Sequence, residues 1–324
     1  MESLNAPLPR QLSPNARPLT VWDMGLGVMT LVAWSSAFPL VQMALRSGVA
    51  PLPLASLRYG LASLIVMPFV ATRLARSGQT TLRLPPASAW PRYLLCGFLG
   101  ITLYNVCLNL GEETVSPATA SLIGASSPVI CGLLGAWLHR DHLSRFGWAG
   151  SALAFAGVLL VCAAQGPLGF GSGTFVLMLA ALGNALFNIL QVPLVRRYGP
   201  GISLCCFIIA GAGFLLPWLP QGIATLLKSP PRTWAILLAL AAIPGVFGYG
   251  CWARLLGRIG APRASLILYG VPPCAIVLTL LLEGSWPNVA TLLGGAVVLA
   301  GLALTRLGSR KPAADPEISA PPEI

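Results

Sequence analysis

The sequence predicts an all-α integral membrane protein in which ten transmembrane helices form two inverted five-helix repeats. Three observations lead to this fold class. Only 9% of the 324 residues are charged, whereas a soluble domain has roughly 25%. Ten apolar stretches follow one another, each long enough to cross a hydrocarbon core of about 30 Å as a helix. The two halves of the chain also match each other at an offset of 144 residues.

The composition excludes soluble, disordered and fibrous proteins. Hydrophobic residues make up 56% of the chain, so a soluble fold could not cover its surface with the few charges present. The net charge of +11 is compatible with nucleic-acid binding, but the basic residues are scattered singly between apolar runs. We therefore expect the lipid bilayer to surround most of the chain, and we expect no nucleic-acid partner.

The expected spans run from residue 24 to residue 306. Backbone groups find no water in lipid, so these segments must be helices; the alternating strands of a barrel do not occur in the sequence. The spans cover residues 24–45, 51–72, 91–110, 118–138, 147–165, 173–194, 203–219, 234–256, 262–282 and 288–306. Residues 1–23 are expected to form a cytoplasmic tail, and residues 308–324 a disordered, Pro-containing cytoplasmic tail.

The distribution of basic residues predicts the orientation. With the amino terminus in the cytoplasm, sixteen Lys and Arg residues fall in inner segments, and only Arg46, Lys228 and Arg232 fall in outer ones. Basic residues that flank spans are retained on the cytoplasmic side. Both termini are therefore predicted to be cytoplasmic.

An internal duplication divides the chain into repeats at 24–165 and 173–307. The offset aligns Ala120-Ser121-Leu122-Ile123 with Ala264-Ser265-Leu266-Ile267, Pro128 with Pro272, Gly150 with Gly294, and Ala156-Gly157 with Ala300-Gly301. Because five is an odd number of spans, the two copies must have opposite orientations in the membrane. Inverted repeats are typical of secondary transporters, which expose a midplane site to each side in turn.

Three features of the sequence resemble a known family. The first span contains Ala33-Trp34-Ser35-Ser36-Ala37-Phe38-Pro39, the second opens with Pro53, Leu54 and Arg58, and residues 121–157 and 265–301 share a mid-helix Pro and a Gly-spaced helix. These features are similar to the EamA-type branch of the drug/metabolite transporter superfamily, over residues 24–307. The acidic turn of that family is kept as Glu283 in the second half. In the first half its place is taken by His139, with Asp141 two residues later.

The resemblance implies a protein of the bacterial inner (plasma) membrane that exports amino acids, related metabolites or drugs. The inverted repeats predict alternating access around a central cavity. We expect the first, third, sixth and eighth spans to line that cavity.

Arg58 is the basic residue that lies well inside a span. At 1.5 Å per residue it lies roughly 10 Å below the outer boundary. Its guanidinium could clamp a substrate carboxylate through two hydrogen bonds. It could also be structural, either snorkelling to headgroups or bonding a carbonyl. The sequence leaves both interpretations open.

Amide and aromatic side chains are the other candidates for the cavity. The spacing of Asn184, Asn188 and Gln191 places all three on one face of the sixth span. Amides inside a membrane either bind a polar substrate or join helices through hydrogen bonds of about 0.6–2 kcal/mol. The remaining candidates are Trp34, Tyr104, Asn105, Asn109, Tyr249, Trp252 and Tyr269.

Proline and acidic residues are the last group of candidates. Pro39, Pro128 and Pro272 are predicted to kink their helices, because Pro lacks a backbone donor. No acid falls at the centre of a span, so coupling to an ion would have to use the boundary acids Glu112 or Glu283. Exchange or facilitated diffusion therefore fits the sequence better than a tightly coupled proton pump.

No cofactor, metal or enzymatic activity is predicted. The sequence contains no nucleotide-binding Gly-rich loop, nucleophile elbow or zinc-protease helix. The expected partners are a small-molecule substrate and the lipid bilayer, and the oligomeric state is left open. The alternative is a non-transporting membrane protein, namely an intramembrane lipid enzyme or a sensor. The enzyme would need a nucleophile or acid pair at equal depth, and the sensor would need a soluble domain.

Overall fold

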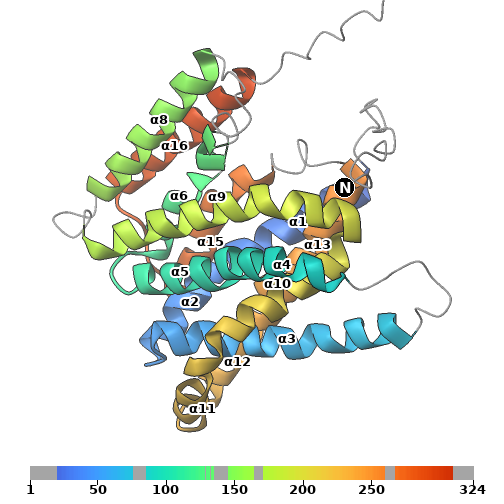
Figure 1. Ribbon diagram of the computed structural model, residues 1–324. Coiled ribbons are helices and arrows are strands. Elements are labelled where there is room, and N and C mark those ends of the chain that lie inside the picture. Colours follow the sequence, from blue (N-terminus) through green and yellow to red (C-terminus); the bar gives the residue numbers. More distant parts are fainter. Residues whose placement is uncertain are drawn as a thin grey trace, which may run out of the picture.

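The computed structural model describes residues 20–75, 85–127, 129–131, 133–134, 145–163, 171–259 and 267–308. Every regular element within these ranges is a helix, as the sequence predicts (Figure 1). The helices are α1 (Val21–Ser35), α2 (Ala37–Arg46), α3 (Pro51–Ala75), η2 (Ala87–Ala89), α4 (Trp90–Gly97), η3 (Phe98–Leu103), α5 (Tyr104–Glu112), α6 (Pro117–Gly124), α8 (Arg145–Ala163), α9 (Ser172–Tyr198), α10 (Pro200–Leu215), η5 (Leu216–Trp218), α11 (Leu219–Leu227), α12 (Pro231–Leu240), η6 (Ala241–Phe247), α13 (Gly248–Ile259), η7 (Ile267–Gly270), α15 (Val271–Glu283) and α16 (Val289–Gly308).

Seven helical segments are long and apolar enough to cross a membrane. They are Val21–Arg46, Pro51–Thr72, Ala87–Glu112, Arg145–Ala163, Ser172–Val195, Pro200–Leu227 and Pro231–Trp252. Three shorter apolar helices, at Pro117–Cys131, Ile267–Glu283 and Val289–Thr305, coincide with the other predicted spans. An all-helical membrane protein is therefore the correct fold class, while ten crossings stay a prediction.

The first span consists of two helices that meet at Ser36. Pro39 lacks the N–H that would bond the carbonyl of Ser35, so a regular helix cannot run through this point. Ser36 Oγ donates to the carbonyl of Ala33 at 2.8 Å. Ser35 Oγ reaches across to the carbonyl of Val271, at 3.1 Å, and ties α1 to α15 in the other half of the chain.

Irregular helical segments recur at the offset of the sequence repeat. The third span contains the π-helical stretch η3 and the eighth span contains the π-helical stretch η6, whose last residue follows that of η3 by 144 residues. Similarly, α6 gives way to a turn at residues 125–126, and the second half is irregular at the equivalent residues of η7. Pro244 lies inside η6, and Pro272 is the second residue of α15, which begins directly after η7. Pro128, the third predicted kink, lies outside the described residues.

The last described helices of the two halves, α8 and α16, pack closely as an antiparallel pair (Figure 1, green and red). Gly150 lies against the backbone of Gly301, and Gly157 lies against that of Gly294. The sequence repeat makes Gly150 equivalent to Gly294, and Gly157 equivalent to Gly301. Each half therefore contributes the same two glycines to reciprocal contacts, which is the pattern that a two-fold axis produces. Small residues allow backbones to approach in this way.

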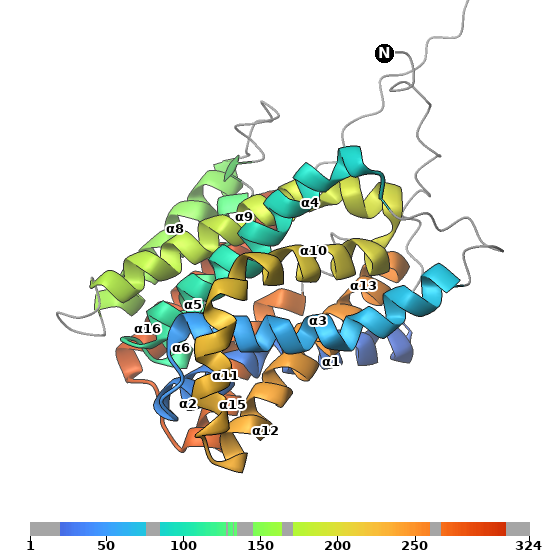
Figure 2. The ribbon, with the colours of Figure 1, turned by 60° about the horizontal axis from the view of Figure 1, so that its bottom comes forward.

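Helix α3 carries Arg58 and is held along its length by neighbouring helices. It lies beside α10, where Ser56 Oγ donates to the carbonyl of Leu215 at 2.8 Å (Figure 2). Asn109 Nδ2 in α5 donates to the carbonyl of Pro51 at 2.9 Å, at the first residue of α3. These contacts fix the depth at which the guanidinium is placed.

Replacing Gly301 by Ala is expected to destabilise the fold. The added Cβ would overlap the backbone of Ala154, which cannot move away without separating α8 from α16. Overpacking of this kind costs about 1–3 kcal/mol, so the melting temperature in detergent should fall. Gly213→Ala is the matched control, because no atom lies within 4 Å of a Cβ at that position. Equal melting temperatures for both variants would contradict the packing described.

Candidate functional site

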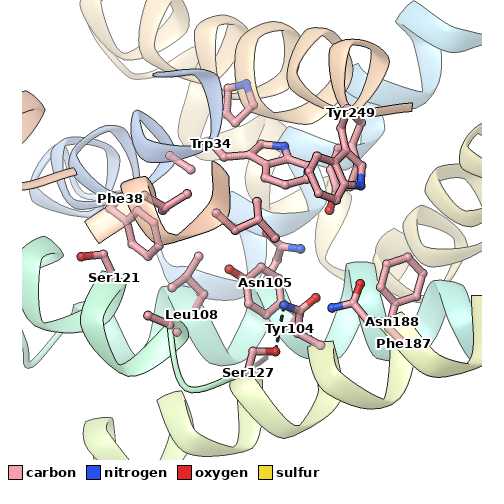
Figure 3. A pocket seen from close by; sticks show the side chains of 18 of the residues that line it. Trp34, Phe38, Tyr104, Asn105, Leu108, Ser121, Ser127, Phe187, Asn188 and Tyr249 are labelled. Carbon is pink, nitrogen blue, oxygen red and sulfur yellow. Dashed lines mark hydrogen bonds between the residues drawn. The ribbon is translucent and has the colours of Figure 1, made fainter. Parts of the chain in front are cut away.

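A cavity of about 210 Å³ lies between the two halves of the chain (Figure 3). Its lining comes from α1, α2, α3, α5 and the α6 region in the first half, and from α9, α10, η6, α13, η7, α15 and α16 in the second. The predicted first, third, sixth and eighth spans all contribute. The expectation was too narrow, however, because the second, fourth, seventh, ninth and tenth spans line the cavity as well.

The structure brings together all but one of the residues predicted to line the cavity. Those that line it are Trp34, Arg58, Tyr104, Asn105, Asn184, Asn188, Gln191, Tyr249, Trp252 and Tyr269. Asn109 is the exception. It is fully buried, and its amide holds the first residue of α3 in place instead of facing the cavity. That the others bind substrate stays a prediction.

Arg58 lies in the wall of the cavity and is only 4% exposed. This burial rules out snorkelling to the headgroups. Nη1 donates to Asn105 Oδ1 at 3.1 Å, and the guanidinium carbon lies 5.1 Å from the centre of the Tyr59 ring. Asn105 is itself fixed, because its Nδ2 donates to the carbonyl of Ile101 at 2.8 Å. Nε of Arg58 has no hydrogen-bond partner among the described residues.

Three aromatic rings form one wall of the cavity. The Trp34 ring lies 5.1 Å from that of Tyr249, edge to face, and 5.2 Å from that of Trp252. Gly248 makes this approach possible, because a Cβ there would lie 2.9 Å from Trp34 Cδ1. The indole Nε1 of Trp34 is buried and meets no acceptor within the described part of the chain. The wall therefore offers apolar surface and one free donor.

The opposite wall carries the amides of α9 on a single helix face (Figure 3). Asn184 Nδ2 donates to Ser127 Oγ at 3.2 Å, and Ser127 Oγ donates in turn to the carbonyl of Ala181 at 3.1 Å. Gln191 Nε2 donates to Asn188 Oδ1 at 2.9 Å. Asn188 is exposed and lines the cavity, so this part of the wall is polar and accessible.

Several lining residues were missed by the sequence analysis. They are Phe38, Tyr59, Leu108, Ser121, Ser127, Phe187, Leu204 and Phe207. Tyr59 could have been inferred as the neighbour of Arg58. The apolar lining residues could not have been identified from the sequence, since a Phe or Leu in a span can face protein, lipid or the cavity.

Ion pairs join the two halves at opposite ends of the helices. Arg46 Nη1 in α2 lies 3.0 Å from Glu283 Oε2 in α15. At the other end, the guanidinium of Arg258 in α13 donates to Asp23 in α1, which also accepts from Thr20 in a capping box. His139, His142 and Asp141 lie outside the described residues, within which no cluster of metal-binding side chains occurs.

These features define a multi-pass membrane protein that holds a small-molecule cavity between two halves. The profile of the EamA-like transporter family matches the chain twice, over residues 22–163 and 171–307. The chain belongs to the EamA-like transporter family. This membership points away from the intramembrane enzyme and sensor considered as alternatives.

Individual relatives agree with the family. A probable terminal-alkyne amino-acid exporter from Streptantibioticus cattleyicolor is 32% identical, over 91% of this chain and 97% of its own length. A probable amino-acid metabolite efflux pump from Salmonella typhimurium is 28% identical, over 59% of this chain and 68% of its own length. A solved crystal structure has a TM-score of 0.60 at 19% identity and covers 89% of this chain and 98% of that one, which shows the fold alone.

Replacing Asn105 by Leu is expected to destabilise the protein. The variant removes the acceptor of Arg58 Nη1 and leaves a buried cation with an unmet donor, which costs about 1–3 kcal/mol or more. Asn188→Leu is the control, because Asn188 is exposed to the cavity and anchors no buried charge. Thermal unfolding of the purified variants should separate them. If Asn105→Leu is as stable as Asn188→Leu, the amide does not support Arg58.

Proposed function

We propose that this protein exports amino acids or similar small metabolites across the plasma membrane by alternating access of its two halves. One observation carries the proposal: a cavity between the halves combines a buried guanidinium, amides on one helix face and a wall of three aromatic rings. The relatives named as exporters and efflux pumps of amino acids and their metabolites support the same class of substrate.

Each part of an amino acid has a partner of suitable chemistry in this cavity. The guanidinium of Arg58 suits a carboxylate, because its N–H donors have a fixed planar arrangement that matches the two carboxylate oxygens in charge-assisted hydrogen bonds. The amide oxygens of α9 suit an ammonium group, and the rings of Trp34, Tyr249 and Trp252 suit an apolar side chain. The cavity therefore favours amphipathic zwitterions over purely hydrophobic compounds.

The direction of opening follows from the lining and the predicted orientation. The lining extends to Val195 and Pro200, where α9 meets α10, on the predicted cytoplasmic side. On the predicted outer side, Arg46 pairs with Glu283, and Gln42 Nε2 lies 3.5 Å from the carbonyl of Val115. The described conformation is thus inward-facing in our proposal. The irregular segments at equivalent positions of the halves supply the discontinuous helices typical of such carriers.

Transport by purified protein in proteoliposomes tests the proposal. We expect counterflow of apolar amino acids, a terminal-alkyne amino acid among them, and no counterflow of the corresponding amino-acid amides, which lack the carboxylate. Purines and lipophilic cations complete the panel. Equal counterflow of amino acids and their amides would exclude the carboxylate as a recognition element, and counterflow of lipophilic cations alone would contradict the proposed substrate class.

Two variants separate the binding groups from the scaffold. Asn188→Leu should lower counterflow at least about tenfold, since one lost hydrogen bond to a charged group costs about 1.5–3 kcal/mol. Lys228→Gln is the control, because Lys228 is exposed and lies outside the cavity lining. Insertion and melting temperature should not change in either variant. Normal counterflow by Asn188→Leu would show that this amide of α9 does not take part in substrate binding.

A further inference from the structure

The first and sixth spans carry a short copy of each other near their ends. At an offset of 149 residues, the α2 copy Phe38-Pro39-Leu40-Val41-Gln42-Met43-Ala44-Leu45 aligns with the α9 copy Phe187-Asn188-Ile189-Leu190-Gln191-Val192-Pro193-Leu194. The Phe, the Gln and the final Leu are identical, and the other positions are apolar apart from Asn188. Because the halves are inverted, the α2 copy lies toward the predicted outer side and the α9 copy toward the predicted cytoplasmic side.

Equivalent residues of the two copies differ in burial. In the α2 copy, Val41 and Ala44 are both 0% exposed and pack in an apolar cluster with residues of α3, α11 and α12. Their counterparts in the α9 copy, Leu190 and Pro193, are both exposed, Leu190 by 36%. Two inverted copies would have equal surroundings if both ends of the cavity were closed alike. The difference therefore indicates that only the end at the α2 copy is closed.

The packing of whole helices shows the same difference. Helix α2 packs against α5, α6, α12 and α15. The counterpart of α5 is α13, because their first residues, Tyr104 and Gly248, are 144 residues apart. Among the described residues, α13 provides no comparable surface for α9. Instead, Gln191 of α9 and Trp252 of α13 both line the cavity. The α2 copy thus covers α5, whereas the α9 copy stands away from α13.

A relay of polar side chains holds the α2 copy in its closed position. Gln42 Nε2 lies 3.5 Å from the carbonyl of Val115, just beyond the end of α5. Arg46 Nη2 donates to Gln42 Oε1 at 3.1 Å, which fixes the direction in which the amide points. Nη1 of the same guanidinium lies 3.0 Å from Oε2 of Glu283, whose side chain is only 2% exposed. The relay joins α2 to both α5 and α15.

The corresponding amide of the α9 copy is bonded differently. Gln191 Nε2 donates at 2.9 Å to Asn188 Oδ1, one turn earlier on its own helix. The offset of 144 makes Ile259, the last residue of α13, the counterpart of Val115. Val195 stands where the α2 copy is followed by Arg46, so a guanidinium equivalent to that of Arg46 is missing from this position of the sequence.

We propose that the two copies are alternating gates, and that Gln191 moves from Asn188 to the carbonyl of Ile259 when the cavity opens to the outside. The inference rests on the proposed alternating access and names the residues that carry it. In the outward-facing state each half takes the conformation that the other half has here, so Gln42 releases Val115. The Arg46–Glu283 pair strengthens the outer gate alone. It therefore favours the inward-facing state of the empty carrier, in which an exporter loads its substrate.

Chemical cross-linking tests the exchange of contacts in a variant that lacks the eight native cysteines. A short bifunctional methanethiosulfonate should join cysteines at Gln42 and Val115 rapidly, which also serves as the folding control. The same reagent should join cysteines at Gln191 and Ile259 slowly, because that pair meets only in the outward-facing state. Cysteines at Val192 and Ile259 are the matched control pair, since Val192 points about 100° around the helix from Gln191. This control pair should not react.

Removal of the ion pair should shift the balance between the gates. In the background of Glu283→Gln or Arg46→Gln, cross-linking between positions 191 and 259 should become about fivefold faster, because its rate follows the population of the outward-facing state. The double variant should be no faster than Arg46→Gln alone, since both changes remove the same pair. Glu113→Gln is the control, because Glu113 is an exposed carboxylate on the same side. It should leave the rate unchanged.

Two results would overturn the inference. One is a 191–259 pair that reacts no faster than the 192–259 control in every background. The other is a rate that does not change when Glu283 or Arg46 is replaced. Neither measurement requires a substrate, so the gates can fail while amino-acid counterflow is normal. Conversely, cross-linking as expected in a protein without amino-acid counterflow would refute the proposed substrate class and support the gates.

Discussion

The buried guanidinium of Arg58 is the constraint around which this protein is organised. A cation placed among apolar helices has no water to solvate it, so the protein must supply compensating groups. Asn105 accepts from Nη1, and the Tyr59 ring lies beside the guanidinium. Helices α3 and α5 owe their relative depth to these groups and to Asn109. A site able to attract an anion is the direct consequence.

The remaining architecture separates a tightly packed region from irregular ones. The pair α8 and α16 approaches through glycines from both halves, and a single added methyl group would collide with backbone there. Around the cavity, by contrast, the helices change pitch in η3 and η6 and are interrupted at Ser36 and at η7. Close-packed interfaces resist deformation, whereas interrupted helices can bend with fewer lost hydrogen bonds. This contrast suits two halves that are held together at α8 and α16 while the irregular segments around the cavity bend.

The helical segments and part of the cavity lining could be predicted from the sequence, because a lipid environment requires apolar helices of a minimum length. Apolar length gave the positions of the helical segments, and the spacing of Asn184, Asn188 and Gln191 placed them on one face, which lines the cavity. Sequence spacing could not predict that Asn105 lines the cavity while Asn109 does not. The two amides are one helical turn apart, and at that distance one faces the cavity and the other bonds the backbone of α3. The burial of Glu112, which is only 2% exposed, was equally hidden, since it depends on helices distant in sequence that cover the end of α5.

The reach of labelling reagents into the cavity tests the central claim most directly. A single cysteine at Asn188, in a variant lacking the eight native cysteines, would be treated with impermeant thiol reagents from each face of sealed vesicles. The account predicts labelling from the cytoplasmic face without substrate, and a shift toward labelling from the outer face during amino-acid exchange. Simultaneous access from both faces would indicate a continuous pore, and access from the outer face alone without substrate would contradict the proposed inward-facing cavity.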